Sequence, residues 1–153
     1  MSNVEENKAL VRSMVAALGR LDKDAFLGFL AEDAEFETTG QHKGAGVKSK
    51  MEVDAEFPAM KEMLPNGIAF EERSIMAEGD RVAMELFGRA KTVHGEDYNN
   101  HYAYFFTIRD GKVVVFRDYM DSTLVERLMV PFFEIYGVTL QDREKARQAG
   151  SIE

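Results

Sequence analysis

The stretch NNHYAYFFTIRDGKVVVFRDYMD, residues 99–121, decides the fold. It holds two runs rich in aromatic and β-branched side chains, which favour strands, and Asp110-Gly111 lies between them. An Asp-Gly pair between two such runs is the strongest short-range signal for a β-hairpin. The sequence therefore predicts two antiparallel strands, over 99–109 and 112–121.

Further strands precede this hairpin. The segments FEERSIMA, residues 70–77, and RVAMELFGRAKTV, residues 81–93, follow the period of two that is typical of strands, and a turn at Gly79 separates them. AEFET, residues 34–38, predicts one more short strand. Together these segments indicate a run of antiparallel strands.

Helical periodicity predicts helices over most of the remaining chain. The expected helices cover residues 4–18, 22–30, 47–63 and 122–138. Asp22 is the expected N-cap of the second helix, Pro58 is expected to kink or divide the third, and Pro131 to break the last. The polar end of the chain after Val138 is expected to be a tail.

Helices followed by antiparallel strands are typical of an α+β fold. We expect a cone-shaped barrel, in which a strongly bent antiparallel sheet wraps over the N-terminal helices and leaves an open mouth. The chain of 153 residues has the usual size of one domain. We therefore expect a single domain over 1–153, with 131–153 as a possible C-terminal extension or tail.

Composition excludes several classes of function. The chain has no cysteine, which removes disulfides, thiolate catalysis and cysteine-ligated zinc. A net charge of −8 disfavours a nucleic-acid surface. The N-terminus lacks the basic and apolar regions of a signal peptide, and no apolar run is long enough to span a membrane. We expect a cytoplasmic protein with no nucleic-acid and no membrane partner.

Motifs for bound groups are missing as well. The three histidines, His42, His94 and His101, have no metal-binding spacing. Neither the dinucleotide-binding nor the phosphate-loop glycine pattern occurs, and there is no G-x-S-x-G nucleophile motif. We expect neither a metal nor a cofactor.

The segment GEDYNNHYAYFFTIRDGKVVVFRDYMD, residues 95–121, resembles the last hairpin of the nuclear-transport-factor-2-like superfamily. The match is closest to SnoaL-like and ketosteroid-isomerase-related proteins, and it depends on the Asp-Gly turn, on FRD at 116–118 and on YMD at 119–121. The opening helix pair followed by AEDAEFET, residues 31–38, is similar too, so that the resemblance covers about residues 5–130. It implies the cone-shaped fold and a homodimer.

The resemblance also implies one catalytic residue. Asp118 corresponds to an acid/base carboxylate of SnoaL-like cyclases and of limonene-epoxide-hydrolase-like enzymes. Those hydrolases also need an Arg-x-Asp pair on the preceding long strand, where this chain has Phe87-Gly88-Arg89. We therefore rank epoxide hydrolysis below the other reactions of this superfamily.

The hairpin turn predicts the neighbours of Asp118. With a two-residue loop, Asp118 lies opposite Ala103, and Phe116 lies opposite Phe105. Asp118 then shares a face with His101, Phe105, Phe116 and Met120. We expect Asp118 and His101 to be the catalytic pair, although a structural aspartate and a structural histidine remain the alternatives.

Further residues are candidates for substrate binding. From the neighbouring strands we select Glu85, Arg89 and Tyr104, with a simple ion pair as the alternative for the two charged ones. Tyr102 and Tyr119 are further candidate hydrogen-bond donors. In the third helix, the stripe of Met51, Phe57, Met60 and Met63 forms either a pocket roof or part of the core. The binding candidates are therefore Arg89, Glu85, Phe105, Phe116, Tyr104, Met120, Met60 and Phe57.

Burial of an aspartate in an apolar pocket raises its pKa into the range that is useful for proton transfer. We therefore expect an acid/base enzyme without a cofactor, an isomerase or an aldol-type cyclase, that acts on a small hydrophobic carbonyl compound. The alternatives are a non-catalytic protein that binds small hydrophobic molecules and a dimeric interaction module of the same fold.

Overall fold

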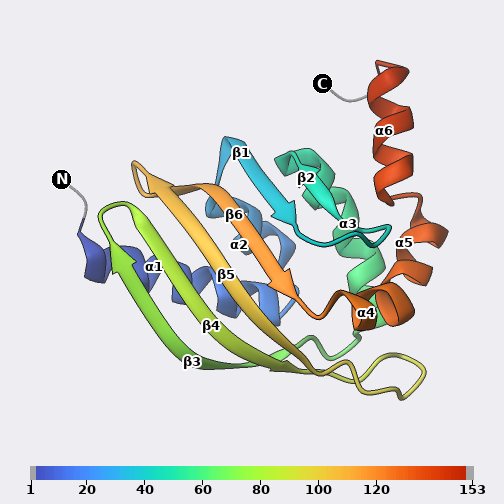
Figure 1. The fold of residues 1–153 in the computed structure, drawn as a ribbon, viewed down its shortest axis with the longest axis horizontal. Helices are drawn as coiled ribbons and strands as arrows, with labels where there is room; N and C mark the ends of the chain where they lie inside the picture. The colour runs from blue at the N-terminus through green and yellow to red at the C-terminus, as the bar shows by residue number, and fades with distance from the viewer. Residues whose placement is uncertain (1–2, 151–153) are drawn as a thin grey trace.

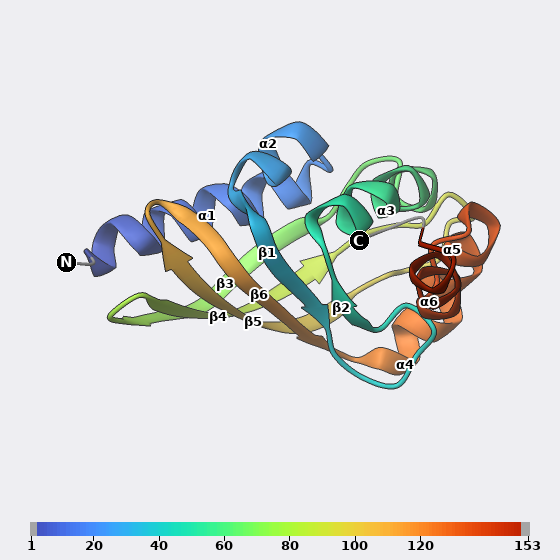
Figure 2. The same ribbon diagram turned by 90° about the horizontal axis from the view of Figure 1, so that it is seen from above.

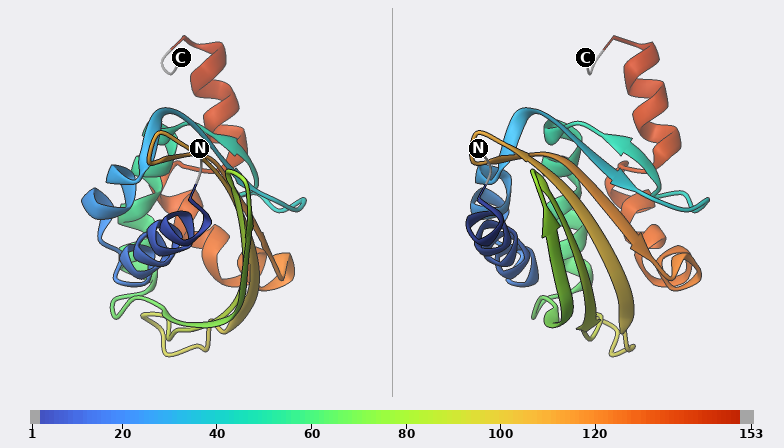
Figure 3. Two further views of the ribbon diagram at one scale, coloured as in Figure 1. Left: turned by 90° about the vertical axis from the view of Figure 1, so that its left-hand side faces the viewer. Right: turned by 60° about the vertical axis from the view of Figure 1, so that its left-hand side comes forward.

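A six-stranded, strongly curved sheet forms the centre of the computed structural model, which describes residues 3–150 (Figure 1). The strands are β1 (Leu30–Thr38), β2 (Gly46–Lys48), β3 (Ala69–Glu78), β4 (Arg81–Arg89), β5 (Asn100–Arg109) and β6 (Lys112–Met120). Their order across the sheet is β2-β1-β6-β5-β4-β3. The sheet bends around the helices without closing (Figure 3), so the expected α+β architecture with a bent sheet over N-terminal helices is confirmed.

One strand pairing differs from the expectation of a fully antiparallel sheet. β1 runs parallel to β6, with Thr38 beside Asp118, whereas every other pairing is antiparallel. Turn signals predict only how consecutive strands pair, and β1 and β6 are far apart in the chain. The sequence also lacked a signal for β2, which occupies the start of the third predicted helix.

The helices α1 (Val4–Gly19), α2 (Lys23–Gly28) and α3 (Lys50–Met63) cover the concave face of the sheet (Figures 2 and 3). Asp22 caps α2 as expected, and its side chain accepts from the Ala25 N–H at 3.2 Å. Ser49 and Glu52 form a reciprocal capping box at the start of α3. Pro58 lies inside α3 without dividing it.

Aromatic rings fill the space between these helices and the sheet. The Phe116 ring centroid lies 4.5 Å from that of Phe106 and 4.7 Å from that of Phe36, and Phe26 packs against Phe57 at 5.6 Å. All five side chains are buried, and the two rings of each pair are tilted relative to each other. Phe57 and Phe116, both binding candidates, therefore belong to the core.

Most of the described C-terminal part, from Ser122 to Gln148, is helical. The short helix α4 (Ser122–Leu124) continues through a π-helical turn η1 (Val125–Met129) into α5 (Val130–Tyr136). The expected interruption near Pro131 takes the form of this π-helical turn, and Pro131 lies in the first turn of α5. The expected tail instead contains α6 (Leu140–Gln148), which begins with a capping box of Thr139 and Asp142.

Two arginines attach α6 to the rest of the fold. Arg143 is 4% exposed and donates to the carbonyls of Val138, at 3.0 Å, and Ala45. Arg147 forms an ion pair with Glu52 at 2.6 Å. None of the helices within residues 3–150 is long and apolar enough to cross a membrane.

Candidate functional site

A β-bulge in β6 decides which side chains face the interior. The hairpin starts as expected, with Arg109 opposite Lys112, and Asp110 and Gly111 take the positive φ angles, 53° and 73°, of a two-residue hairpin loop. Past this point, Ile108 pairs with Val113 but Thr107 pairs with Val115, so one extra residue is inserted in β6.

The bulge shifts the register by one residue and reverses the predicted faces. Asp118 lies opposite Tyr104 instead of Ala103, and Phe116 lies opposite Phe106 instead of Phe105. The face that Asp118 shares therefore contains tyrosines in place of His101 and Phe105.

Four of the predicted site residues lie on the outer face of the sheet. His101 is exposed and its ring lies 4.6 Å from that of Phe87. Arg89 is exposed and pairs with Glu71 at 3.1 Å. Glu85 and Phe105 also point outward, since each alternates with buried neighbours in its strand. The structure therefore does not place these four near Asp118.

The predicted candidates Asp118, Tyr104, Met120 and Met60 lie together on the wall of a small, partly open cavity of about 70 Å³. The cavity lies between the concave face of the sheet, α3 and the η1–α5 segment. Its other polar wall residues are Thr38, His42, Lys48, Glu56, Tyr98 and Tyr102. Met51 and Met63 do not line it, since Met51 is largely exposed and Met63 is buried elsewhere.

The carboxyl group of Asp118 is the most unusual group on this wall. Its Oδ1 is buried and has no hydrogen-bond partner among residues 3–150. Burial raises the pKa of Asp118 to about 7, while the nearby Lys48 lowers it and Glu56 raises it further. At neutral pH this carboxyl group exists in both protonation states, which suits a group that takes up and returns a proton.

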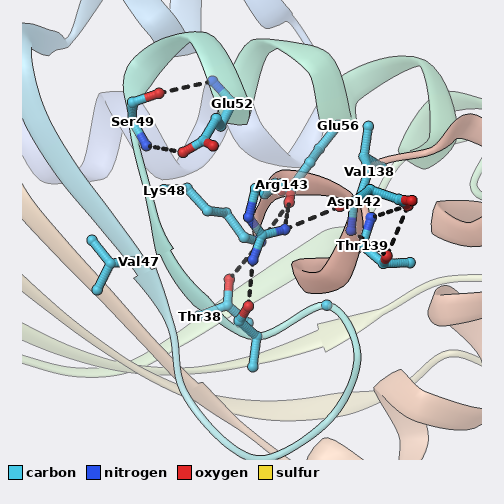
Figure 4. Close-up of polar contacts among 12 residues, drawn as sticks. Thr38, Val47, Lys48, Ser49, Glu52, Glu56, Val138, Thr139, Asp142 and Arg143 are labelled. Atoms are coloured by element: carbon cyan, nitrogen blue, oxygen red, sulfur yellow. Dashed lines mark hydrogen bonds and ion pairs between the residues drawn. The ribbon is translucent and has the colours of Figure 1, made fainter. Parts of the chain in front are cut away.

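Lys48, Glu56 and Arg143 form a buried ion cluster (Figure 4), and two of its members, Lys48 and Glu56, also affect the pKa of Asp118. Lys48, at the end of β2, is 2% exposed, and its Nζ lies 2.5 Å from Oε2 of Glu56 and 3.1 Å from the Thr38 hydroxyl. Arg143 reaches the same Glu56 oxygen at 3.7 Å. Because both groups lose their hydration, the pKa of Lys48 is lowered and that of Glu56 is raised.

His42 also lines the cavity, and it comes from the loop between β1 and β2. Its Nδ1 accepts from the Gly44 N–H at 3.1 Å, and its Nε2 lies 3.2 Å from the Thr39 carbonyl. These contacts assign the proton to Nε2 of a neutral ring. Burial lowers the pKa of His42, and Lys48 lowers it further, so His42 shapes the loop as an uncharged group.

Three phenols face the interior near Asp118. Tyr102 and Tyr104 come from β5, while Tyr98 comes from the loop before it, where its N–H donates to the Ala90 carbonyl at 2.8 Å. Burial raises the pKa of all three phenols. They therefore remain protonated hydrogen-bond donors, whereas Tyr119 points outward and is 45% exposed.

Five polar residues of the cavity wall were not predicted from the sequence: Thr38, His42, Lys48, Glu56 and Tyr98. One of them had a usable signal: Glu56 follows Val53 by three residues and precedes Met60 by four, so it lies on the apolar stripe of α3. A carboxylate in such a stripe indicates a buried partner. Lys48 had no such signal, because its strand was not predicted.

The sequence and the fold agree with a known family. A family model for the SnoaL-like domain matches residues 11–116. The chain belongs to the SnoaL-like domain family. No curated protein sequence matches this SnoaL-like domain.

Solved structures share the fold over nearly their whole length. An NTF2-like protein from Burkholderia xenovorans is 25% identical, with a TM-score of 0.65 over 83% of this chain and 98% of its own. AclR from Streptomyces galilaeus, described as a candidate hydroxylase, is 24% identical, with a TM-score of 0.69 over 86% and 98%. A candidate SnoaL-like polyketide cyclase from Jannaschia is 15% identical, with a TM-score of 0.68 over 82% and 92%.

Metal ligation has no support in the side-chain arrangement. Across residues 3–150, no group of three His, Asp or Glu side chains is placed so that it could hold a metal ion. Of the two carboxylates on the cavity wall, Glu56 forms an ion pair with Lys48, a cation of the protein itself.

Proposed function

We propose that this SnoaL-like domain catalyses proton transfer at the carbon next to the carbonyl group of a small apolar compound, as an isomerase or an aldol-type cyclase. The observation that carries the proposal is the buried carboxyl group of Asp118, with an unpartnered oxygen on the cavity wall and a pKa of about 7. A base of this pKa is matched to a reaction at neutral pH.

The reaction needs only groups of this chain. The ionised Asp118 removes a proton from the α-carbon, and the electrons of the broken C–H bond form a C=C bond as the carbonyl oxygen becomes an anion. A phenol such as Tyr104 donates a hydrogen bond to that oxygen. Asp118 then returns the proton to another carbon. In the cyclisation, the enolate carbon instead attacks a second carbonyl carbon and closes a ring, and Asp118 gives its proton to the alkoxide oxygen that forms there.

Apolar walls support the same chemistry. Phe36, Met60, Ile68 and Met120 line the cavity beside the polar groups. Such walls exclude water and strengthen the electrostatic interactions inside. Methionine side chains adapt to ligands of different shape, so Met60 and Met120 would allow the cavity of about 70 Å³ to enlarge as a substrate enters.

Exchange of the α-carbon hydrogens of added ketones with deuterium from the solvent tests this proposal. It can be followed for many compounds, so that no single substrate has to be chosen. The protein is incubated in D₂O with a panel of small cyclic ketones and enones, and deuterium at the α-carbon is followed by NMR. We expect accelerated exchange with at least one compound, and a loss of about 100-fold or more in Asp118→Asn. The matched control is Glu85→Gln, which removes a carboxylate from the outer face. Exchange at the wild-type rate in Asp118→Asn contradicts the proposal.

Binding without catalysis is the second candidate. The observation that favours it is the mostly apolar cavity wall, which would bind a small hydrophobic molecule without any proton transfer. Thermal stabilisation by a compound that shows no Asp118-dependent exchange would support it. The homodimer implied by the resemblance stays a prediction, which light scattering on the purified protein tests.

A further inference from the structure

We propose that Lys48 is the group that holds the oxygen of the substrate, and that the site takes carbonyl compounds that readily become oxygen anions, such as enolisable 1,3-dicarbonyl compounds. The inference rests on the proposed function, because Lys48 would place a positive charge beside the substrate oxygen that becomes negative when Asp118 removes a proton. It goes further in naming the substrate class and the residue that selects it.

The contacts of Lys48 leave room for a ligand oxygen. An ammonium group has three N–H bonds. Among residues 3–150, the Lys48 Nζ has two partners, the carboxylate of Glu56 at 2.5 Å and the hydroxyl of Thr38 at 3.1 Å. Lys48 is also on the cavity wall, beside Asp118. One N–H therefore remains for an acceptor inside the cavity.

The charges of the buried cluster favour an anionic ligand. Lys48 and Arg143 bring two positive charges, and Glu56, the carboxylate between them, brings one negative charge. The buried carboxylate of Glu52 is balanced separately by Arg147. One positive charge is left over, and an ionised Asp118 balances it. When Asp118 takes a proton from the substrate, the negative charge moves to the substrate oxygen, and the total charge of the buried cluster stays the same.

Lys48 suits this role better than Arg143 does. The guanidinium of Arg143 donates to the carbonyls of Val138 and Ala45, and Arg143 is not on the cavity wall. Burial lowers the pKa of Lys48, and the Glu56 carboxylate at 2.5 Å opposes this shift because it stabilises the charged ammonium form. The geometry therefore supports an ion-pairing role and not a covalent one.

Binding of a matched pair of compounds tests the inference. The anionic probe is 1,3-cyclohexanedione, which is largely ionised at neutral pH, and the neutral probe is cyclohexanone. We expect the wild-type protein to bind the dione at least about tenfold more tightly than the ketone, as a charge-assisted hydrogen bond predicts. Lys48→Met should abolish this preference. The control is Lys61→Met, which removes the charge of an exposed lysine on α3.

A second measurement does not depend on the stability of the variant. In wild-type protein with isotope-labelled lysine, the dione should shift the Nζ and Cε resonances of Lys48 and leave those of Lys61 unchanged. Unchanged Lys48 resonances at saturating dione, or an undiminished preference in folded Lys48→Met, would overturn the inference. A borohydride-trapped adduct of cyclohexanone on Lys48 would also overturn it, because it requires a neutral amine.

The readouts separate the two proposals. Dione binding that depends on Lys48, in a protein without α-carbon exchange, supports the role of Lys48 and contradicts the proposed catalysis. Exchange that depends on Asp118, in a protein whose Lys48→Met variant binds the dione as tightly as wild type, supports catalysis and contradicts the role of Lys48.

Discussion

The two faces of the sheet carry similar residue types in very different surroundings. On the concave face, Asp118 has a buried Oδ1 and a pKa raised to about 7, and Lys48 and Glu56 form an ion pair away from water. On the convex face, Glu71 and Arg89 form an exposed pair at a comparable distance, 3.1 Å. The difference teaches that the chemistry of this fold is determined by burial, and that a one-residue bulge decides which side chains are buried.

The largest expected difference between the two faces is in how much the loss of one carboxylate lowers the free energy of unfolding. Glu56→Gln removes the carboxylate shared by Lys48 and Arg143 and leaves two buried cations without a counter-charge. Loss of one partner of a buried pair costs about 3–5 kcal/mol. Glu71→Gln breaks the exposed pair with Arg89 and should cost less than about 1 kcal/mol. Free energies of unfolding from urea titrations compare the two, and equal losses would contradict the importance of burial.

The second prediction concerns the pH dependence of stability. The pKa of Asp118 is about 7 in the folded protein, against about 3.9 in the unfolded chain. Between these values the folded state binds the extra proton, so its stability falls as the pH rises from about 4 to about 7. The full effect reaches about 4 kcal/mol, at 1.36 kcal/mol for each pKa unit.

Asp118→Asn lacks this titration. Its stability relative to wild type should therefore increase between pH 4.5 and pH 7.5, as measured by urea unfolding at both pH values. Glu85→Gln on the outer face should change little between them. Parallel curves for wild type and Asp118→Asn would mean that the carboxyl group titrates as an ordinary aspartate.

The smallest expected difference is between the stability costs of replacing two histidines, one on each side of the sheet. His42→Ala removes the acceptor for the Gly44 N–H and the contact with the Thr39 carbonyl, and should cost about 1–3 kcal/mol. His101→Ala lies on the exposed face and should change stability by less than about 0.5 kcal/mol. It should also leave any α-carbon exchange unchanged. A loss of α-carbon exchange in His101→Ala would contradict this assignment and indicate that His101 takes part in the reaction.

Much of the fold follows from local signals in the sequence. The Asp110-Gly111 turn and the strand periods predicted the successive hairpins, and the capping pattern at Asp22 predicted the start of α2. The parallel pairing of β1 with β6 has no local signal, because it joins segments that no turn connects. The helix α6 was missed because its sequence is polar and its attachment depends on the burial of Arg143.

The site was less predictable, for a physical reason. The resemblance pointed to Asp118, but the face that it shares depends on the bulge within Val113-Val114-Val115. Three valines in succession fit either register, so the sequence pattern cannot place the extra residue. Lys48 and Glu56 are charged residues whose burial depends on their mutual contact, which the spacing along the chain does not reveal.

Titration of the Asp118 carboxyl carbon by NMR tests the central claim most directly. The protein is labelled with ¹³C-aspartate, and the resonance is assigned from its absence in Asp118→Asn. We predict a midpoint near pH 7, as expected for a carboxyl group buried on the cavity wall. A midpoint near the ordinary aspartate value of about 3.9 would show a solvated carboxylate. That result would contradict both the buried site and the proton transfer proposed for it.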